Sequence, residues 1–219
     1  HWPGAARWLG GALGALALLA STLSGCQRES GPREMSFQVD AGLLGNPVAD
    51  PTLEVTFRAP RELLPAPPEF VQAAQREMEA KPPSDPYSDL IPAQIYADPS
   101  GEMRIFVSRF RTPPATVAGG GGSGGGLSEA WRKSYQEKAT AKVHATDPTA
   151  AIESDYYRLG PVPVLQLVIR GKGYVNFRLV CAAEHSPTFQ VDYVVPTARW
   201  KDMARAVESS IGSLAFHHP

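Results

Sequence analysis

The chain contains two cysteines, and one of them lies near side chains that could activate a thiol. Cys181 is followed closely by Glu184 and His185, and a thiol beside an imidazole base is a possible nucleophile pair. However, Cys181 ends a strongly apolar stretch, where a free cysteine usually packs as a small hydrophobic residue. The sequence from His185 to Pro187 is typical of a turn. We therefore expect Cys181 to be structural and no catalytic residue to be present.

The other cysteine, Cys26, follows an apolar stretch over residues 8–22 that is preceded by the single base Arg7. A basic start, an apolar segment and small residues before a cut are typical of a secretory signal. Leu23-Ser24-Gly25-Cys26 resembles the bacterial lipobox. That resemblance implies cleavage after the motif Leu23, Ser24, Gly25 and a lipid anchor on Cys26. The alternative is an uncleaved membrane span, which would be short and weakened by its glycines.

The lipobox sets the expected organisation of the rest of the chain. Residues 1–25 would be the signal peptide, and residues 26–52, which are broken by Gly and Pro, would be a flexible tether. The location would be the bacterial cell envelope. Gln27, rather than aspartate, favours the periplasmic side of the outer membrane in a host with two membranes. With Cys26 lipidated, Cys181 has no partner for an intramolecular disulfide.

Composition excludes several classes of function. A net charge of −1 with interleaved acidic and basic residues provides no basic patch that could bind nucleic acid. The glycine-rich loop at 119–126 is followed by Leu-Ser-Glu and not by the lysine that a phosphate-binding loop requires. The five histidines show no metal-ligand spacing, and His217 and His218 lie at the C-terminal end. We expect no cofactor and no metal.

Hydrophobic periodicity indicates alternating groups of strands and helices. Ser36–Val39 could form a short edge strand. Strands are expected at 53–57, 91–97, 103–110, 151–158, 162–170, 174–183 and 188–195, and helices at 68–80, 129–140 and 198–214. Turn residues at 98–101 and 171–173 predict two hairpins. The fold class is therefore α+β, a mostly antiparallel β-sheet flanked by helices, in a single domain over 53–216.

The expected helices show which side chains should pack inward. Phe70, Ala73, Ala74 and Met78 share one face of the first helix. Ser128 is a good N-cap for the second helix. Leu127, Trp131 and Tyr135, which lie four residues apart, should be core anchors and not a ligand cage. The last helix carries a continuous apolar stripe that ends at Leu214.

Residues 189–215 resemble the PsbP-like fold family. The shared pattern is a last strand that ends in Tyr-x-x-Pro, here Tyr193–Pro196, followed by a helix that closes with Ser-Ser-Ile-x-Ser-Leu, here Ser209–Leu214. The resemblance implies an antiparallel sheet with helices on both faces, an α/β/α sandwich. It also implies a chiefly non-enzymatic family of assembly factors and partner-binding modules. The glycine-rich loop departs from the family pattern.

Three hypotheses for function follow. The first is a membrane-anchored, non-enzymatic envelope lipoprotein that acts as an accessory module and binds another envelope protein. The second is a carrier of a small apolar ligand or lipid, which requires an apolar pocket with few polar groups. The third is an unrecognised enzyme that uses Cys181 and His185, which requires both side chains to face one accessible cleft.

Overall fold

The computed structural model describes residues 32–83, 85–87, 89–114, 116–117, 126–183 and 186–217. The expected signal peptide, its cleavage motif Leu23–Gly25 and the anchor Cys26 lie outside these residues. Glu184, His185 and all of the glycine-rich loop except Gly126 also lie outside them.

The described residues form one large sheet of eight strands in the order β1-β9-β10-β11-β12-β6-β5-β4. Only β1 and β9 pair in parallel, and every other neighbouring pair is antiparallel. The strands are β1 (Arg33–Met35), β4 (Leu64–Pro65), β5 (Leu90–Ala97), β6 (Arg104–Phe110), β9 (Ala151–Leu159), β10 (Val162–Gly171), β11 (Tyr174–Cys181) and β12 (Phe189–Pro196). The expected α+β class with a mostly antiparallel sheet is confirmed.

Two small sheets and three helices complete the described part of the chain. The three-stranded sheet has the order β13-β3-β2, and β7 pairs with β8. The remaining elements are β2 (Val48–Asp50), β3 (Val55–Phe57), β7 (Thr116–Val117), β8 (Gly126–Leu127), β13 (Ala215–Phe216), a short 3-10 helix (Ala41–Leu43), α1 (Pro68–Ala80), α2 (Glu129–Thr146) and α3 (Thr197–Gly212).

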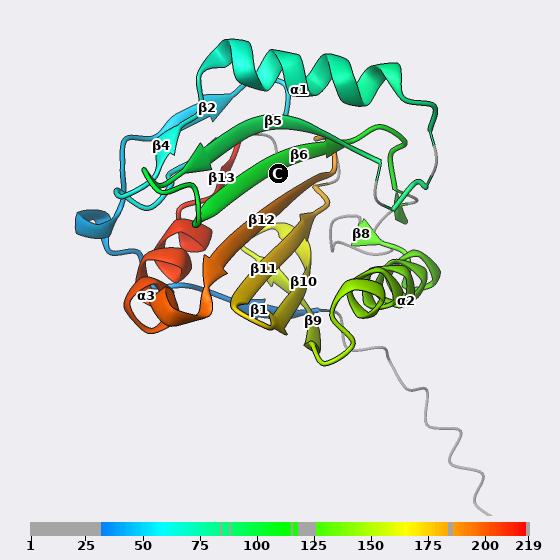
Figure 1. The fold of residues 1–219 in the computed structure, drawn as a ribbon. Coiled ribbons are helices and arrows are strands. Elements are labelled where there is room, and N and C mark those ends of the chain that lie inside the picture. The colour runs from blue at the N-terminus through cyan, green and yellow to red at the C-terminus, as the bar shows by residue number, and fades with distance from the viewer. Residues whose placement is uncertain are drawn as a thin grey trace, which may run out of the picture. The chain divides into compact units, whose positions relative to one another are not determined.

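The large sheet has a hydrophobic core on each face. On one face, α3 packs through Met203, Val207 and Ile211 together with β3 of the small sheet. On the other face, α2 packs through its three buried residues, Trp131, Tyr135 and Ala139. Figure 1 shows α2 and α3 on either side of the large sheet and α1 beside β5. The arrangement is the expected α/β/α sandwich.

Both expected hairpins are present. Strands β10 and β11 pair from Gly171↔Tyr174 to Val164↔Cys181, and Gly173 in the turn has a φ of 87°, which favours glycine. Between β5 and β6 the turn is closed by Asp98, whose carboxylate accepts the Met103 N–H at 3.0 Å. Both turns depend on residues only a few positions apart in the chain, which explains why the sequence pattern predicted them.

The domain begins earlier than residue 53. The segment 26–52 was expected to be a flexible tether, but residues 33–35 pair with β9 and residues 48–50 pair with β3. The expected strand at Ser36–Val39 is wrong, since the strand lies over Arg33–Met35. Both errors have the same cause: strands of three residues are too short to show the alternation that identifies longer ones.

Two helix predictions also need correction. Helix α1 has the expected bounds, but its partly buried face is Val71, Ala74, Gln75 and Met78, while Phe70 is 59% exposed. Helix α2 continues to Thr146 instead of stopping at 140. No glycine or proline interrupts it before Pro148, and proline disfavours helical geometry in the residue that precedes it.

Candidate functional site

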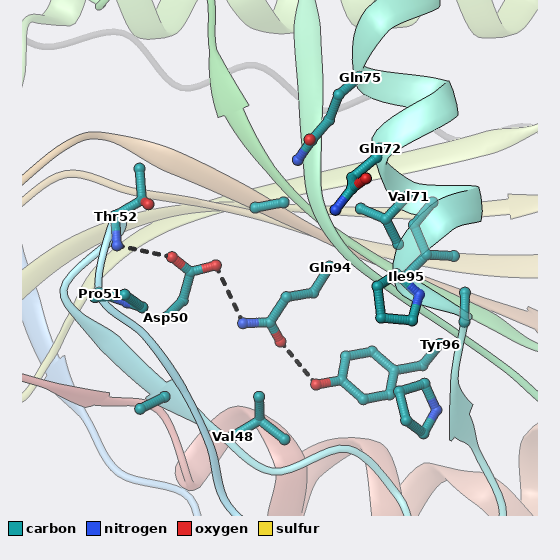
Figure 2. Close-up of a pocket in the computed structure, with 15 residues that line it drawn as sticks. Val48, Asp50, Pro51, Thr52, Val71, Gln72, Gln75, Gln94, Ile95 and Tyr96 are labelled. Carbon is teal, nitrogen blue, oxygen red and sulfur yellow. Dashed lines mark hydrogen bonds between the residues drawn. The ribbon is translucent and has the colours of Figure 1, made fainter.

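A groove of about 440 Å³ opens between β2, α1 and β5 (Figure 2). The small sheet supplies one wall, α1 supplies the other, and β5 of the large sheet lies between them, with Pro65 of β4 also in the lining. The residues that line the groove are Val48, Ala49, Asp50, Pro51, Thr52, Pro65, Ala66, Pro68, Val71, Gln72, Gln75, Ala93, Gln94, Ile95 and Tyr96.

The α1 wall is a stripe of residues at helical spacing. Pro68, Val71, Gln72 and Gln75 recur at intervals of three and four, so they share one face of the helix. Proline is tolerated at the first helical position, which explains why the helix can begin at Pro68. The side chain of Gln75 donates from Nε2 to the Pro92 carbonyl at 2.9 Å and so ties α1 to β5. No α1 residue is fully buried, because the inner face borders the groove.

The β5 side of the groove contains an irregularity in strand pairing. The register with β6 shifts between Pro92 and Gln94, as expected where proline lacks an N–H for the ladder. Beyond this bulge, Gln94 and Tyr96 lie two residues apart and point to the same side of the strand. That side faces β2, from which Asp50 approaches (Figure 2).

Asp50, Gln94 and Tyr96 form a continuous row of hydrogen bonds. Gln94 donates from Nε2 to Asp50 Oδ2 at 3.2 Å, and the Tyr96 hydroxyl donates to Gln94 Oε1 at 2.7 Å. Asp50 Oδ1 also accepts the backbone N–H groups of Thr52 and Leu53, each at 3.0 Å. Asp50 is 8% exposed and Tyr96 is 4% exposed, so the row is held mostly away from water.

Burial determines the acid–base character of this row. Loss of hydration, together with the smaller effect of the negative charge of Asp50, raises the pKa of Tyr96 to about 12. The phenol is therefore neutral at physiological pH and acts as a hydrogen-bond donor. The row can orient a ligand by hydrogen bonding, but it contains no nucleophile paired with a base.

The thiol of Cys181 does not lie in the groove. It is fully buried in the core on the α3 side of the large sheet, in the same cluster as Tyr157 and Tyr193. Burial raises the pKa of the Cys181 thiol, which disfavours the reactive thiolate. A fully buried thiol cannot face an accessible cleft, as catalysis by Cys181 and His185 would require.

The histidines near the ends of described elements have local partners. His144 bonds the Ala150 carbonyl at 3.1 Å, and His217 bonds the Thr56 hydroxyl at 2.9 Å. Across the described residues, no group of three or more histidine, cysteine or acidic side chains could hold a metal ion. In the same residues, no helix has both the length and the apolar run that crossing a membrane requires.

The sequence did not predict the groove. Two of its signals were visible, a stripe of glutamines over residues 72–75 and a proline within the strand at Pro92. Neither the glutamines nor the proline indicates a site, because the sequence does not show that β2 lies opposite β5. Their juxtaposition depends on long-range pairing of the small sheet.

Comparison with known proteins finds a similar fold among the solved structures. No protein-family model matches the chain, and no curated protein matches it. Among solved structures, the chain is similar to cyanobacterial PsbP (CyanoP) from Synechocystis sp. PCC 6803, whose solution structure it matches with a TM-score of 0.50 and 10% sequence identity. The match covers 81% of this chain and 95% of that chain. It shows that this chain has a PsbP-like fold, and at such low identity it shows the fold alone.

Proposed function

We propose that this PsbP-like domain is a lipid-anchored, non-enzymatic accessory module of the bacterial envelope that binds an extended segment of another envelope protein. The observation that carries the proposal is the groove, which combines an amide-lined helix face with an outermost strand. The anchor is supported by the Leu-Ser-Gly-Cys motif that ends at Cys26.

The chemistry of the groove suits a peptide backbone. An extended peptide presents N–H donors and C=O acceptors along its length, and each glutamine side chain offers both kinds of group. Gln72 and Gln75 place two such amides along one wall. Strand β2 is the outermost strand of the small sheet, and such strands commonly accept an added strand. Pro51, Pro65 and Pro68 supply apolar surface between the polar groups.

The carrier hypothesis receives less support from this site. A carrier of lipid or another apolar molecule needs an apolar cavity with few polar groups. The groove has the required volume, but Asp50, Gln72, Gln75, Gln94 and the Tyr96 hydroxyl contribute to its lining. Covering the exposed amide of Gln72 and the partly exposed amide of Gln75 with an apolar ligand would cost free energy, because their hydrogen bonds to water would not be replaced.

The anchor can be tested by metabolic labelling with a fatty acid in a bacterial host. The full chain should incorporate the label, and Cys26→Ser should abolish incorporation. Cys181→Ser is the matched control, because it removes the other cysteine and should leave labelling unchanged. Equal labelling of the full chain and Cys26→Ser would refute the anchor.

The groove can be tested by photo-crosslinking in living cells. A photoreactive residue at position 72 should crosslink one envelope protein. The same residue at position 76, which is exposed on α1 but outside the groove, should not. Ala49→Arg, which fills the groove, should abolish the crosslink, whereas Ala73→Arg on the exposed side of α1 should preserve it. Equal crosslinking from both positions, or no effect of Ala49→Arg, would contradict the proposal.

A further inference from the structure

A second, smaller cavity lies at helix α2, on the face of the large sheet opposite α3. Its volume is about 110 Å³, and we refer to it as the α2 pocket. The residues that line it are Asp85, Tyr87, Leu90, Tyr135, Lys138, Ala139, Lys142, Arg178 and Gln190. It shares no residue with the groove, so the two sites can be studied separately.

The inner end of the α2 pocket is built from a buried polar network. The Tyr135 hydroxyl donates to Gln190 Oε1 at 2.6 Å, and both residues are only 1% exposed. Arg178 donates from Nε to Asp192 Oδ1 at 2.7 Å. A guanidinium group carries five N–H donors, and this bond uses one of them. Arg178 also hydrogen-bonds the Tyr135 side chain, so the network holds the guanidinium in place and leaves at most three of its five N–H donors for other acceptors.

Two lysines on consecutive turns of α2 form the outer part of the pocket. Lys138 is fixed by Asp85, whose Oδ1 lies 3.1 Å from its Nζ, and by the Tyr87 ring, whose centroid lies 4.5 Å from the same atom. Lys142 is four residues further along the same helix face. It is exposed at the mouth of the pocket.

The charges of the pocket do not balance. Lys138, Lys142 and Arg178 line it, and Asp85 is the one acidic residue in its lining. Asp192 lies behind the lining and neutralises part of the Arg178 charge. Even with both carboxylates counted, one positive charge remains beside a partly desolvated cavity. Such a cavity attracts a negative group more strongly than an open surface does.

The volume limits which negative group can enter. A water molecule occupies about 30 Å³ in the liquid, so the α2 pocket holds the equivalent of three or four waters. That space suits one phosphate or carboxylate group and is too small for a nucleotide. We propose that the α2 pocket binds a small oxyanion group, with Arg178 at its inner end and Lys138 and Lys142 at its mouth.

Titration calorimetry on the full chain in detergent tests this proposal, with inorganic phosphate and acetate as separate probes at constant ionic strength. We expect saturable binding of one anion per chain. Lys142→Gln should weaken it about tenfold, which corresponds to roughly 1.4 kcal/mol. The matched control is Lys133→Gln, an exposed lysine of α2 outside the pocket, which should leave the affinity unchanged. Tighter binding of phosphate or of acetate identifies which oxyanion the pocket prefers.

Three results would overturn the proposal. The first is no saturable binding of either anion, and the second is equal weakening by Lys142→Gln and Lys133→Gln. The third is binding that disappears at constant pH when inert salt is raised modestly, because this would indicate general attraction to a positive surface and no built site. Circular dichroism of both variants confirms that any loss of binding does not come from unfolding.

Discussion

Asp50 and Gln94 are joined by a hydrogen bond of 3.2 Å that connects the small sheet to the large one. Asp50 ends strand β2, and Gln94 follows the bulge in strand β5. The same carboxylate also accepts two backbone N–H groups of the turn that leads to β3. This one side chain therefore shapes the turn, positions the wall of the groove and orients the amide at its base.

Replacing Asp50 with alanine should destabilise the domain. Three N–H donors would lose a mostly buried acceptor, and leaving buried donors unsatisfied should lower the free energy of unfolding by about 2–4 kcal/mol. Urea unfolding followed by circular dichroism measures this change. Glu102→Ala, at an exposed position in the β5–β6 turn, should change stability by less than about 0.5 kcal/mol. A similarly small effect of Asp50→Ala would show that the bonds are not important for stability.

Stability should fall at alkaline pH, in part because of Tyr96. In the unfolded chain a tyrosine ionises near pH 10, whereas burial raises the pKa of Tyr96 to about 12 in the fold. The stabilisation is thus fully present below pH 10 and is lost as the pH rises toward 12. Tyr96→Phe removes this titration but keeps Tyr135, Tyr157 and Tyr193, so its unfolding free energy should decline less steeply over that interval. If the unfolding free energies of the unaltered chain and Tyr96→Phe fell equally steeply between pH 10 and 12, the raised pKa of Tyr96 would be contradicted.

Cys181 should be inert to thiol reagents in the folded domain. The thiol is fully buried and burial raises its pKa, so an aromatic disulfide reagent should label it only after unfolding. The measurement uses Cys26→Ser, which leaves Cys181 as the sole thiol, with and without urea. Cys181→Ser should lower the unfolding free energy by about 1–3 kcal/mol, since it buries a hydroxyl in an apolar cluster. Rapid labelling of the native protein would reopen the possibility of an accessible nucleophile.

Ser128 should contribute measurably to stability as the N-cap of α2. Its hydroxyl oxygen accepts the Trp131 N–H at 3.2 Å, which satisfies one of the unpaired donors at the helix start. Ser128→Ala should cost about 1 kcal/mol, and Ser128→Asp should retain the stability because aspartate is an equally good cap. Chemical unfolding of the three proteins gives the comparison. A loss of equal size in both variants would mean that the cap bond is not the cause.

Much of the secondary structure could be predicted because its causes are local. The bounds of α1 follow from Pro68 and the Pro82-Pro83 pair, and the start of α2 follows from Ser128. The β10–β11 hairpin follows from two apolar runs around Gly173. Each of these signals acts over a few residues, within the range in which sequence pattern and backbone preference agree.

Positions near the start of the domain could not be predicted in the same way. Strand β1 joins the sheet through a parallel pairing of Arg33 with Tyr157, and three residues carry too little pattern to predict that partner. The inward face of α1 was also mispredicted, because Phe70 belongs to an apolar set by periodicity but the fold offers it no core to enter. Hydrophobic spacing predicts that a helix has an apolar face, but the elements packed around the helix determine whether that face is buried.

Local sequence patterns were enough to predict the α+β class, the order of the main elements and the lipobox-like motif at Cys26, since each depends on residues close together in the chain. The groove and the α2 pocket, in contrast, exist only because of the tertiary structure. The groove requires Asp50 and Gln94, which are 44 positions apart, and the α2 pocket requires Tyr135 and Gln190, which are 55 positions apart. Contacts over such distances arise only when strands pair and helices pack onto the sheet, because no local preference of the backbone encodes them.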